Sequence, residues 1–183
     1  GRGMAYCATC DGMFYRNRTV VVVGGGNSAV ADALFLAKIC KKVYIVHRRD
    51  TLRASKTYMK TLEKTENIEF VWDSRVVEVL HDDLVTGVKV ENVKTGEVSE
   101  LSCEGVFVAV GRTPNTDMFK GVLDLDAQGY LIADETTKTN IPGVFAVGDV
   151  RTKPLRQIVT ATADGAVASK YAEEYLAELC ADK

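Results

Sequence analysis

The 183-residue sequence contains no apolar run long enough to cross a bilayer and no large excess of either charge. A membrane-spanning helix needs about 18 or more consecutive apolar residues, so no membrane span is expected. Basic side chains number 23 and acidic side chains 25, which gives a formal net charge of −2 and a pI of about 5.8. Because binding to nucleic acid or to an anionic membrane relies on a basic surface, neither is expected as a partner.

Cysteine and histidine are scarce as well. The five cysteines are odd in number, and only Cys7 and Cys10 lie close together. A secreted disulfide framework needs several pairs, so a reducing, cytoplasmic compartment is expected. A zinc site would need a second Cys-x-x-Cys or a histidine pair. The two histidines, His47 and His81, are far apart, and no metal site is expected.

The first half of the sequence alternates between strand and helix patterns. A β-branched run over 19–23 predicts a buried strand, and helical spacing of apolar residues follows over 28–39. A second strand over 42–46 and a second helix over 52–64 complete the unit. This order predicts an α/β fold with a Rossmann-like parallel sheet.

Short strands replace this pattern after residue 67. They are predicted as an antiparallel β-meander, with a turn at 94–97, over residues 68–72, 76–80, 85–93 and 98–103. A strand over 106–110 then returns to the parallel sheet. The following segment is turn-rich up to a closing helix over 160–179, and a boundary near residue 116 predicts domains 1–116 and 117–183.

The turn after the first predicted strand has the spacing of a dinucleotide-binding loop. Gly24 permits a tight turn, Gly26 lets the backbone approach a pyrophosphate, and Ala29 lets the helix pack on the strand. Asn27 and Ser28 open the helix, where free amides bind phosphate. The alternative is a glycine turn that merely ends a strand.

The end of the second strand, roughly 20 residues further on, distinguishes the two nicotinamide dinucleotides. An acidic residue there binds a ribose hydroxyl, whereas this sequence has His47, Arg48 and Arg49, with Arg53 nearby. Guanidinium groups pair with a 2′-phosphate, so NADPH is the expected cofactor. Asp50 is expected to orient an arginine. The alternative is a solvated basic patch.

Cys7 and Cys10 form a Cys-x-x-Cys pair that can close into a redox-active disulfide. Asp11 follows directly and could donate and accept the proton that thiol exchange requires. A structural or metal-binding pair, or a thioredoxin-type active site, is the alternative. A thioredoxin, however, is far smaller and has no dinucleotide-binding turn.

Taken together, these motifs resemble the low-molecular-weight, bacterial-type thioredoxin reductases, over essentially the whole chain. The residues that carry the resemblance are Cys7–Gly12 with Phe14–Asn17, Gly24–Ala29, His47–Asp50 with Arg53, Gly148–Val150, Arg156–Ile158 and Ala161.

The resemblance implies a flavoprotein, a homodimer in its full-length form, in which a hydride passes from NADPH to FAD, then to the disulfide, then to thioredoxin. It places Cys10 nearer the flavin and makes Asp11 the acid/base. Gly148 and Asp149 would bind the ribityl and phosphate region of FAD, unless they form an ordinary turn. Further family positions are Arg156, Gln157 and Ala161 near the isoalloxazine, and Gly111 with Pro114 near the nicotinamide.

One departure from the family concerns the FAD domain, which in the family is discontinuous. Its first half carries a second glycine fingerprint before the dithiol, and this sequence has a single fingerprint. We therefore expect 117–183 to be the second part of an FAD domain, within a fragment that has an internal or processed start. Such a chain alone would bind NADP(H) but hold FAD poorly and turn over slowly.

Two other functions remain open at this point. The chain could come from a reductase of a peroxiredoxin-type partner, which shares the dithiol and the fingerprint. It could instead be a non-catalytic NADP(H)-binding or sensing module, in which the dithiol takes no part in electron transfer.

Overall fold

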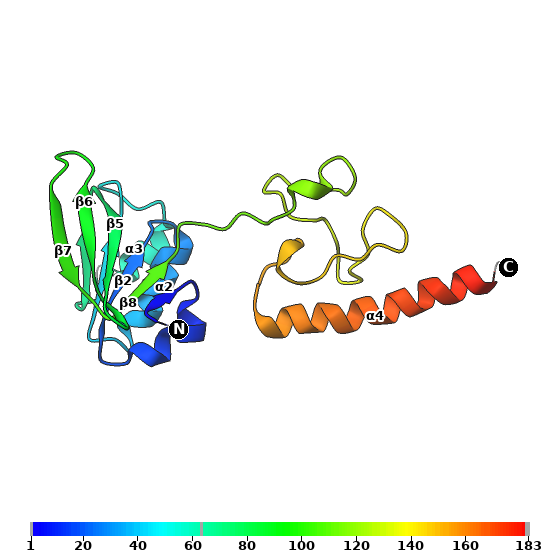
Figure 1. Cartoon of the computed structure of the whole chain (residues 1–183), viewed down its shortest axis with the longest axis horizontal. Helices are drawn as coiled ribbons and strands as arrows, with labels where there is room; N and C mark the ends of the chain where they lie inside the picture. The colour runs from blue at the N-terminus through cyan, green and yellow to red at the C-terminus, as the bar shows by residue number, and fades with distance from the viewer. Residues whose placement is uncertain (1, 63, 182–183) are drawn as a thin grey trace. The chain divides into compact units, whose positions relative to one another are not determined.

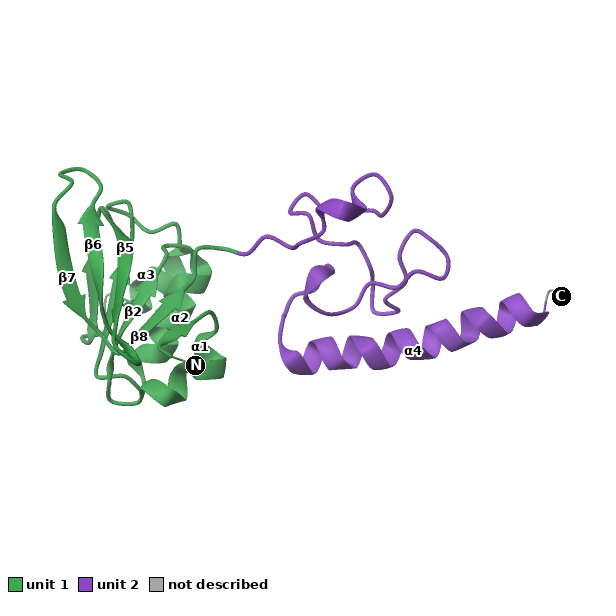
Figure 2. Cartoon of the chain, viewed as in Figure 1, with its two compact units in different colours: residues 1–111 green, residues 112–183 purple. Residues whose placement is uncertain are grey.

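The structure is a computed structural model that describes residues 2–62 and 64–181. The chain divides into two compact units, Gly1–Gly111 (unit 1) and Arg112–Lys183 (unit 2), coloured green and purple in Figure 2. Each unit has its own core of buried apolar side chains. The assignment of the two parts to an NADPH-binding and an FAD-binding domain remains a prediction.

Unit 1 is built on a five-stranded parallel sheet, as the alternating pattern predicts (Figure 1). Its strands, in spatial order, are β1 (Met4–Ala5), β8 (Gly105–Val108), β2 (Thr19–Val23), β3 (Lys42–Val46) and β4 (Ile68–Val71). The valines at 20, 21 and 22 of β2 are fully buried because both faces of a parallel sheet are covered.

Three short helices accompany this sheet: α1 (Ala8–Asp11), α2 (Asn27–Ala37) and α3 (Lys56–Leu62). A 3-10 turn over Gly12–Tyr15 follows α1. Helix α2 buries Ala29, Val30, Ala33 and Leu36, which belong to the same apolar core as the strands. Helix α1, which carries Cys10, packs against α2.

Strand β4 corrects one detail of the sequence-based prediction, which assigned 68–72 to the meander. It pairs in parallel with β3, with Ile68 beside Val43, and so extends the parallel sheet. The antiparallel sheet therefore has three strands, β5 (Ser74–His81), β6 (Val85–Asn92) and β7 (Val98–Ser102). Alternation of apolar residues marks a strand but does not identify its neighbour.

Helix α3 begins at Lys56, four residues later than the predicted start at residue 52. The preceding residues form a loop whose backbone amides donate hydrogen bonds to the glycine turn and to the first residue of α2. The Arg53 amide donates to the Gly25 carbonyl at 2.7 Å, and the Ser55 amide donates to Asn27 Oδ1 at 2.9 Å. These bonds keep the loop after β3 beside the turn after β2.

Unit 2 has little regular structure before its last helix. It contains two 3-10 turns, Asp117–Phe119 (η2) and Gly148–Val150 (η3), and the long helix α4 (Ile158–Ala181). A small core of buried apolar residues holds the turns together: Leu123, Leu131, Ala133 and Ala146.

Candidate functional site

An open pocket of about 400 Å³ lies in unit 1 where β2, β3 and β8 end. In parallel α/β sheets, ligands bind outside the carboxyl ends of the strands. Eight residues expected from the sequence line this pocket: Gly24, Gly26, Asn27, Ser28, His47, Arg48, Arg53 and Gly111. Of the other residues expected in unit 1, Ala29 is fully buried in α2, and Arg49 is not among the lining residues.

The glycine turn has the conformation that a phosphate loop requires. Gly24 has φ +147°, and a Cβ there would lie 2.4 Å from the Ala109 carbonyl oxygen. At Gly26, by contrast, a Cβ would meet nothing within 4 Å, so the chain itself leaves open space there. Gly26 precedes α2, and no side chain caps this helix start. The first amides of α2 are thus available to an anion.

Because only Gly24 is in close contact with another part of the backbone, we expect substitution of Gly24 to affect stability and substitution of Gly26 to affect nucleotide binding. Because Gly26 is the N-cap of α2, where alanine is less favourable than glycine, we expect Gly26→Ala to lower the free energy of unfolding by no more than about 1 kcal/mol. The added methyl group would obstruct the approach of a phosphate and cost one charge-assisted hydrogen bond, about ten- to a hundredfold in nucleotide affinity. Isothermal titration calorimetry and urea unfolding of the same variant check both expectations.

Gly24→Ala provides the comparison. Its methyl group would collide with the Ala109 carbonyl, so the free energy of unfolding of this variant should be lower even without nucleotide. If Gly26→Ala destabilises the protein as much as Gly24→Ala does, position 26 does not have the open space described above.

His47 lies beneath the glycine turn and is only 6% exposed. A Cβ on Gly25 would lie 2.3 Å from its ring, so the imidazole occupies the space that Gly25 leaves free. Burial lowers the pKa of His47, and the charges of Arg49, Arg53 and Arg48 lower it further. Its Nε2 has no hydrogen-bond partner among the residues that the structure describes, which leaves one buried polar atom for a ligand.

The arginines after β3 are exposed, and within the described part of the chain no carboxylate pairs with Arg48, Arg49 or Arg53. Asp50 does not orient an arginine as the sequence led us to expect. Its ion pair is with Lys94, at 3.7 Å, because the turn between β6 and β7 brings that lysine close. The free guanidinium groups of Arg48 and Arg53 give the pocket a positive corner suited to a phosphate.

The lowered pKa of His47 predicts that unit 1 loses stability as the pH falls below about 6.5, the pKa of histidine in an unfolded chain. The unfolded chain binds a proton there before the folded one does. Urea unfolding followed by the fluorescence of Trp72, the single tryptophan, should show a lower midpoint at pH 5.5 than at pH 7.5. His47→Gln should reduce this difference, whereas His81→Gln, at an exposed position in β5, should retain it.

Cys7 and Cys10 form a disulfide at the start of α1. Cys7 is the N-cap residue, and its Sγ accepts a hydrogen bond from the Cys10 amide at 3.2 Å. Cys10 is exposed, and Asp11 is half-buried. Since the amide would also stabilise a thiolate on Cys7, the geometry suits thiol–disulfide exchange at an accessible bond.

In unit 2, the predicted residues gather around η3 and the start of α4. Gly148 has φ +72°, and a Cβ there would lie 3.6 Å from Ala161 Cβ. Arg156 donates from Nε to the Asp149 carbonyl at 3.1 Å, and its guanidinium lies 3.8 Å from the centre of the Tyr130 ring. Asp149 is exposed, and Gln157 is half-buried just before α4.

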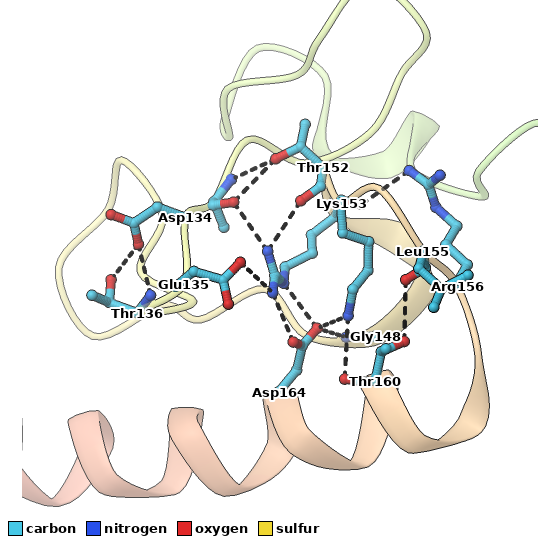
Figure 3. A network of polar contacts seen from close by, with 12 residues as sticks. Asp134, Glu135, Thr136, Gly148, Thr152, Lys153, Leu155, Arg156, Thr160 and Asp164 are labelled. Carbon is cyan, nitrogen blue, oxygen red and sulfur yellow. Dashed lines mark hydrogen bonds and ion pairs between the residues drawn. The ribbon is translucent and has the colours of Figure 1, made fainter.

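Sequence reasoning missed the buried ionic cluster that supports η3. Asp164, on α4, accepts hydrogen bonds from the Gly148 amide at 2.9 Å, from Arg151 at 2.7 and 2.8 Å, and from Lys153 at 2.6 Å. Figure 3 shows Asp164 facing Gly148 and Lys153. Hydrogen bonds from Arg151 and Lys153 hold the pKa of Asp164 well below its usual range. An acidic residue within a mostly apolar helix stretch is the signal that could have revealed it.

Within residues 2–62 and 64–181, no helix is long and apolar enough to span a bilayer. Nor do three or more His, Cys, Asp or Glu side chains of this described part cluster as metal ligands would.

A dinucleotide-type pocket and an accessible disulfide in one compact unit are the features of a disulfide oxidoreductase that uses a nicotinamide dinucleotide. The chain belongs to the family described as pyridine nucleotide-disulphide oxidoreductase, which matches residues 1–165.

Curated relatives are named thioredoxin reductase, in agreement with the resemblance inferred from the sequence. The protein from Streptomyces coelicolor is 49% identical over 98% of this chain and 56% of its own length, and that from Listeria monocytogenes is 47% identical with the same coverage. A solved thioredoxin reductase from Streptococcus pyogenes matches 97% of this chain and 58% of its own, with a TM-score of 0.91 and 47% identity. The chain thus spans a little over half the length of these relatives.

Proposed function

We propose that the chain is the nucleotide-binding and dithiol-bearing part of an NADPH-dependent thioredoxin-disulfide reductase. The observation that carries this proposal is an accessible Cys7–Cys10 disulfide in the same unit as a pocket with an open glycine turn and the exposed arginines Arg48 and Arg53. The names of the relatives support the choice of thioredoxin as the disulfide partner.

The pocket residues fit NADPH. The open space at Gly26 and the uncapped start of α2 suit the pyrophosphate. Arg48 and Arg53 suit a 2′-phosphate, and the unpaired Nε2 of His47 offers one more polar contact at the same corner. When bound, NADPH supplies a hydride.

The residues of unit 2 that the family resemblance assigns to FAD also fit that group in part. Gly148 turns the backbone with its amide held by Asp164, which leaves the Asp149 side chain exposed for a ligand hydroxyl. Arg156, Gln157 and Ala161 flank this turn. When bound, FAD passes an electron pair toward a disulfide.

The chemistry of the chain itself is centred on the two sulfurs. On taking up two electrons and two protons, the Cys7–Cys10 bond becomes two thiols, and the amide of Cys10 favours loss of a proton from Cys7. The Cys7 thiolate attacks the disulfide of thioredoxin and forms a mixed disulfide while one thioredoxin sulfur leaves. Cys10 then attacks Cys7, which closes the original bond and releases reduced thioredoxin. Asp11, next to Cys10, would exchange the proton.

Exchange with thioredoxin can be tested without flavin. The chain is reduced with dithiothreitol, desalted and mixed with oxidised thioredoxin, and the thiols of each protein are then counted. We expect transfer of one electron pair. Reduced Cys10→Ser should instead form a stable mixed disulfide through Cys7 with a single-cysteine thioredoxin whose thiol is first converted to its thionitrobenzoate disulfide, because thionitrobenzoate then leaves and no second thiol reverses the step. Cys7→Ser should form less of this mixed disulfide.

A second measurement separates electron transfer from sensing. Thiol titration after addition of NADPH should show reduction of Cys7–Cys10 only when FAD is supplied. If the whole protein carries bound FAD and NADPH still fails to reduce the pair, the chain is a binding module and the proposal is wrong.

We further propose that the whole protein is a homodimer and works in the reducing cytoplasm. The compartment is supported by Cys40, Cys103 and Cys180, which are free thiols. Burial raises the pKa of both Cys40 and Cys103 to about 11, so these two thiols stay protonated and unreactive. The dimer rests on the family resemblance.

A further inference from the structure

Arg75 also lines the pocket, but its surroundings differ from those of the other arginines there. It lies opposite Glu91 in the β5–β6 pair, and the two side chains form a bidentate ion pair. Arg75 Nη2 lies 3.2 Å from Oε1 and 2.9 Å from Oε2, and Nε lies 3.1 Å from Oε2. This pair balances the charge of Arg75 and fixes the plane of its guanidinium group.

The start of β5 is bonded directly to the basic turn after β3. The Ser74 amide donates to the His47 carbonyl at 2.9 Å, and the Asp73 amide donates to the Arg49 carbonyl at 3.2 Å. Arg75 is therefore adjacent to the corner where Arg48 would bind a 2′-phosphate. In a 2′-phosphorylated adenosine the base and this phosphate are attached to neighbouring ribose carbons, so a group beside the phosphate corner meets the base.

We propose that Arg75 is the platform on which the adenine ring of the nucleotide stacks, held flat by Glu91. This inference rests on the proposed NADPH site. A guanidinium plane stacks well on an aromatic base, and Val76, the next lining residue, adds apolar surface. Because Glu91 neutralises its charge, Arg75 raises affinity for the adenine base and does not distinguish a 2′-phosphate from a 2′-hydroxyl.

Two ligands without nicotinamide test this role: adenosine 2′,5′-bisphosphate and ADP, titrated by calorimetry into the full chain. We expect Arg75→Ala to weaken both by a similar factor, about three- to tenfold. Arg48→Ala should weaken the 2′-phosphorylated ligand alone. Lys89→Ala is the matched control, because it removes the Lys89–Glu78 ion pair from the same two strands at a position outside the pocket.

The outcomes distinguish this inference from the proposal on which it rests. A loss confined to adenosine 2′,5′-bisphosphate would make Arg75 a phosphate ligand and overturn the platform role. Equal affinities in Arg75→Ala and Lys89→Ala would also overturn it. If the unmodified chain binds neither ligand, the nucleotide site itself is wrong. Trp72 fluorescence during urea unfolding shows that each variant is folded under the conditions of titration.

Discussion

Replacing both Arg48 and Arg53 by alanine is expected to weaken NADPH binding by about a hundredfold or more and to leave NADH binding nearly unchanged. Each charge-assisted hydrogen bond to phosphate contributes about 1.5–3 kcal/mol, so two such bonds give this factor. Both arginines line the pocket and lack a carboxylate partner among the described residues. Their removal should therefore cost binding energy and little stability.

Salt provides an independent check on this expectation. Because the guanidinium groups are exposed, their attraction for phosphate should weaken as ionic strength rises, and the preference for NADPH should weaken with it. Calorimetric titration of both nucleotides at two salt concentrations measures this. In the double variant the two nucleotides should bind alike at either concentration.

Arg49→Ala is the informative comparison, since Arg49 is exposed but does not line the pocket. It should cost less NADPH affinity than Arg48→Ala or Arg53→Ala. Equal losses of NADPH and NADH in the double variant would mean that the arginines support the fold and do not select the cofactor.

Asp164→Ala is expected to destabilise unit 2 by about 3–5 kcal/mol, the typical cost of removing one partner from a buried ion pair. Asp164 is 5% exposed and Arg151 is 2% exposed, so the substitution removes the buried carboxylate that Arg151 and Lys153 share. It leaves Arg151 only the exposed Glu135, at 3.9 Å. It also removes the acceptor of the Gly148 amide. The effect should appear as a lower urea midpoint of the circular dichroism at 222 nm, to which α4 contributes.

The same carboxylate sets the pH dependence of this effect. Its pKa is lowered in the folded chain, so its contribution is complete above the unfolded value of about 3.9 and disappears as the pH falls through the folded value. The difference between wild type and Asp164→Ala should thus be largest near pH 7 and shrink below about pH 4.

Lys170→Ala is the control on the same helix, because it removes an exposed ion pair with Glu174 and should leave the midpoint unchanged. The urea midpoint followed by the fluorescence of Trp72, in unit 1, should be the same in both variants as in the wild type. A midpoint for Asp164→Ala equal to that of Lys170→Ala would show that the buried cluster does not stabilise η3.

Much of unit 1 is predictable from local signals. The β-branched run at Thr19–Val23 and the glycine spacing after it define a strand, a turn and a helix within one stretch of chain. The position of Arg75 in the pocket cannot be predicted from local signals, because it depends on which strand lies beside the turn after β3. The same holds for the pairing of β4, and for Asp50, whose partner comes from a distant hairpin.

Unit 2 shows a different limit. Gly148 and Asp149 were found by resemblance, since a Gly-Asp pair alone predicts only a turn. The turn is fixed by the Asp164 carboxylate, which lies 15 residues after Asp149 on α4. The sequence of this segment predicts a helix but does not indicate which residues Asp164 contacts. Ionic clusters between separate segments have no regular residue spacing, so a sequence pattern cannot predict them.

The attachment of the loop after β3 to the glycine turn has a consequence for evolution. The bonds from the Arg53 amide and the Ser55 amide use main-chain donors, so neither depends on a guanidinium group. Under the proposed function, mutation at Arg48 or Arg53 would therefore remove the preference for a 2′-phosphate while the bonds between the loop and the glycine turn persist. The coenzyme preference could therefore change during evolution through a few substitutions, without a change of fold.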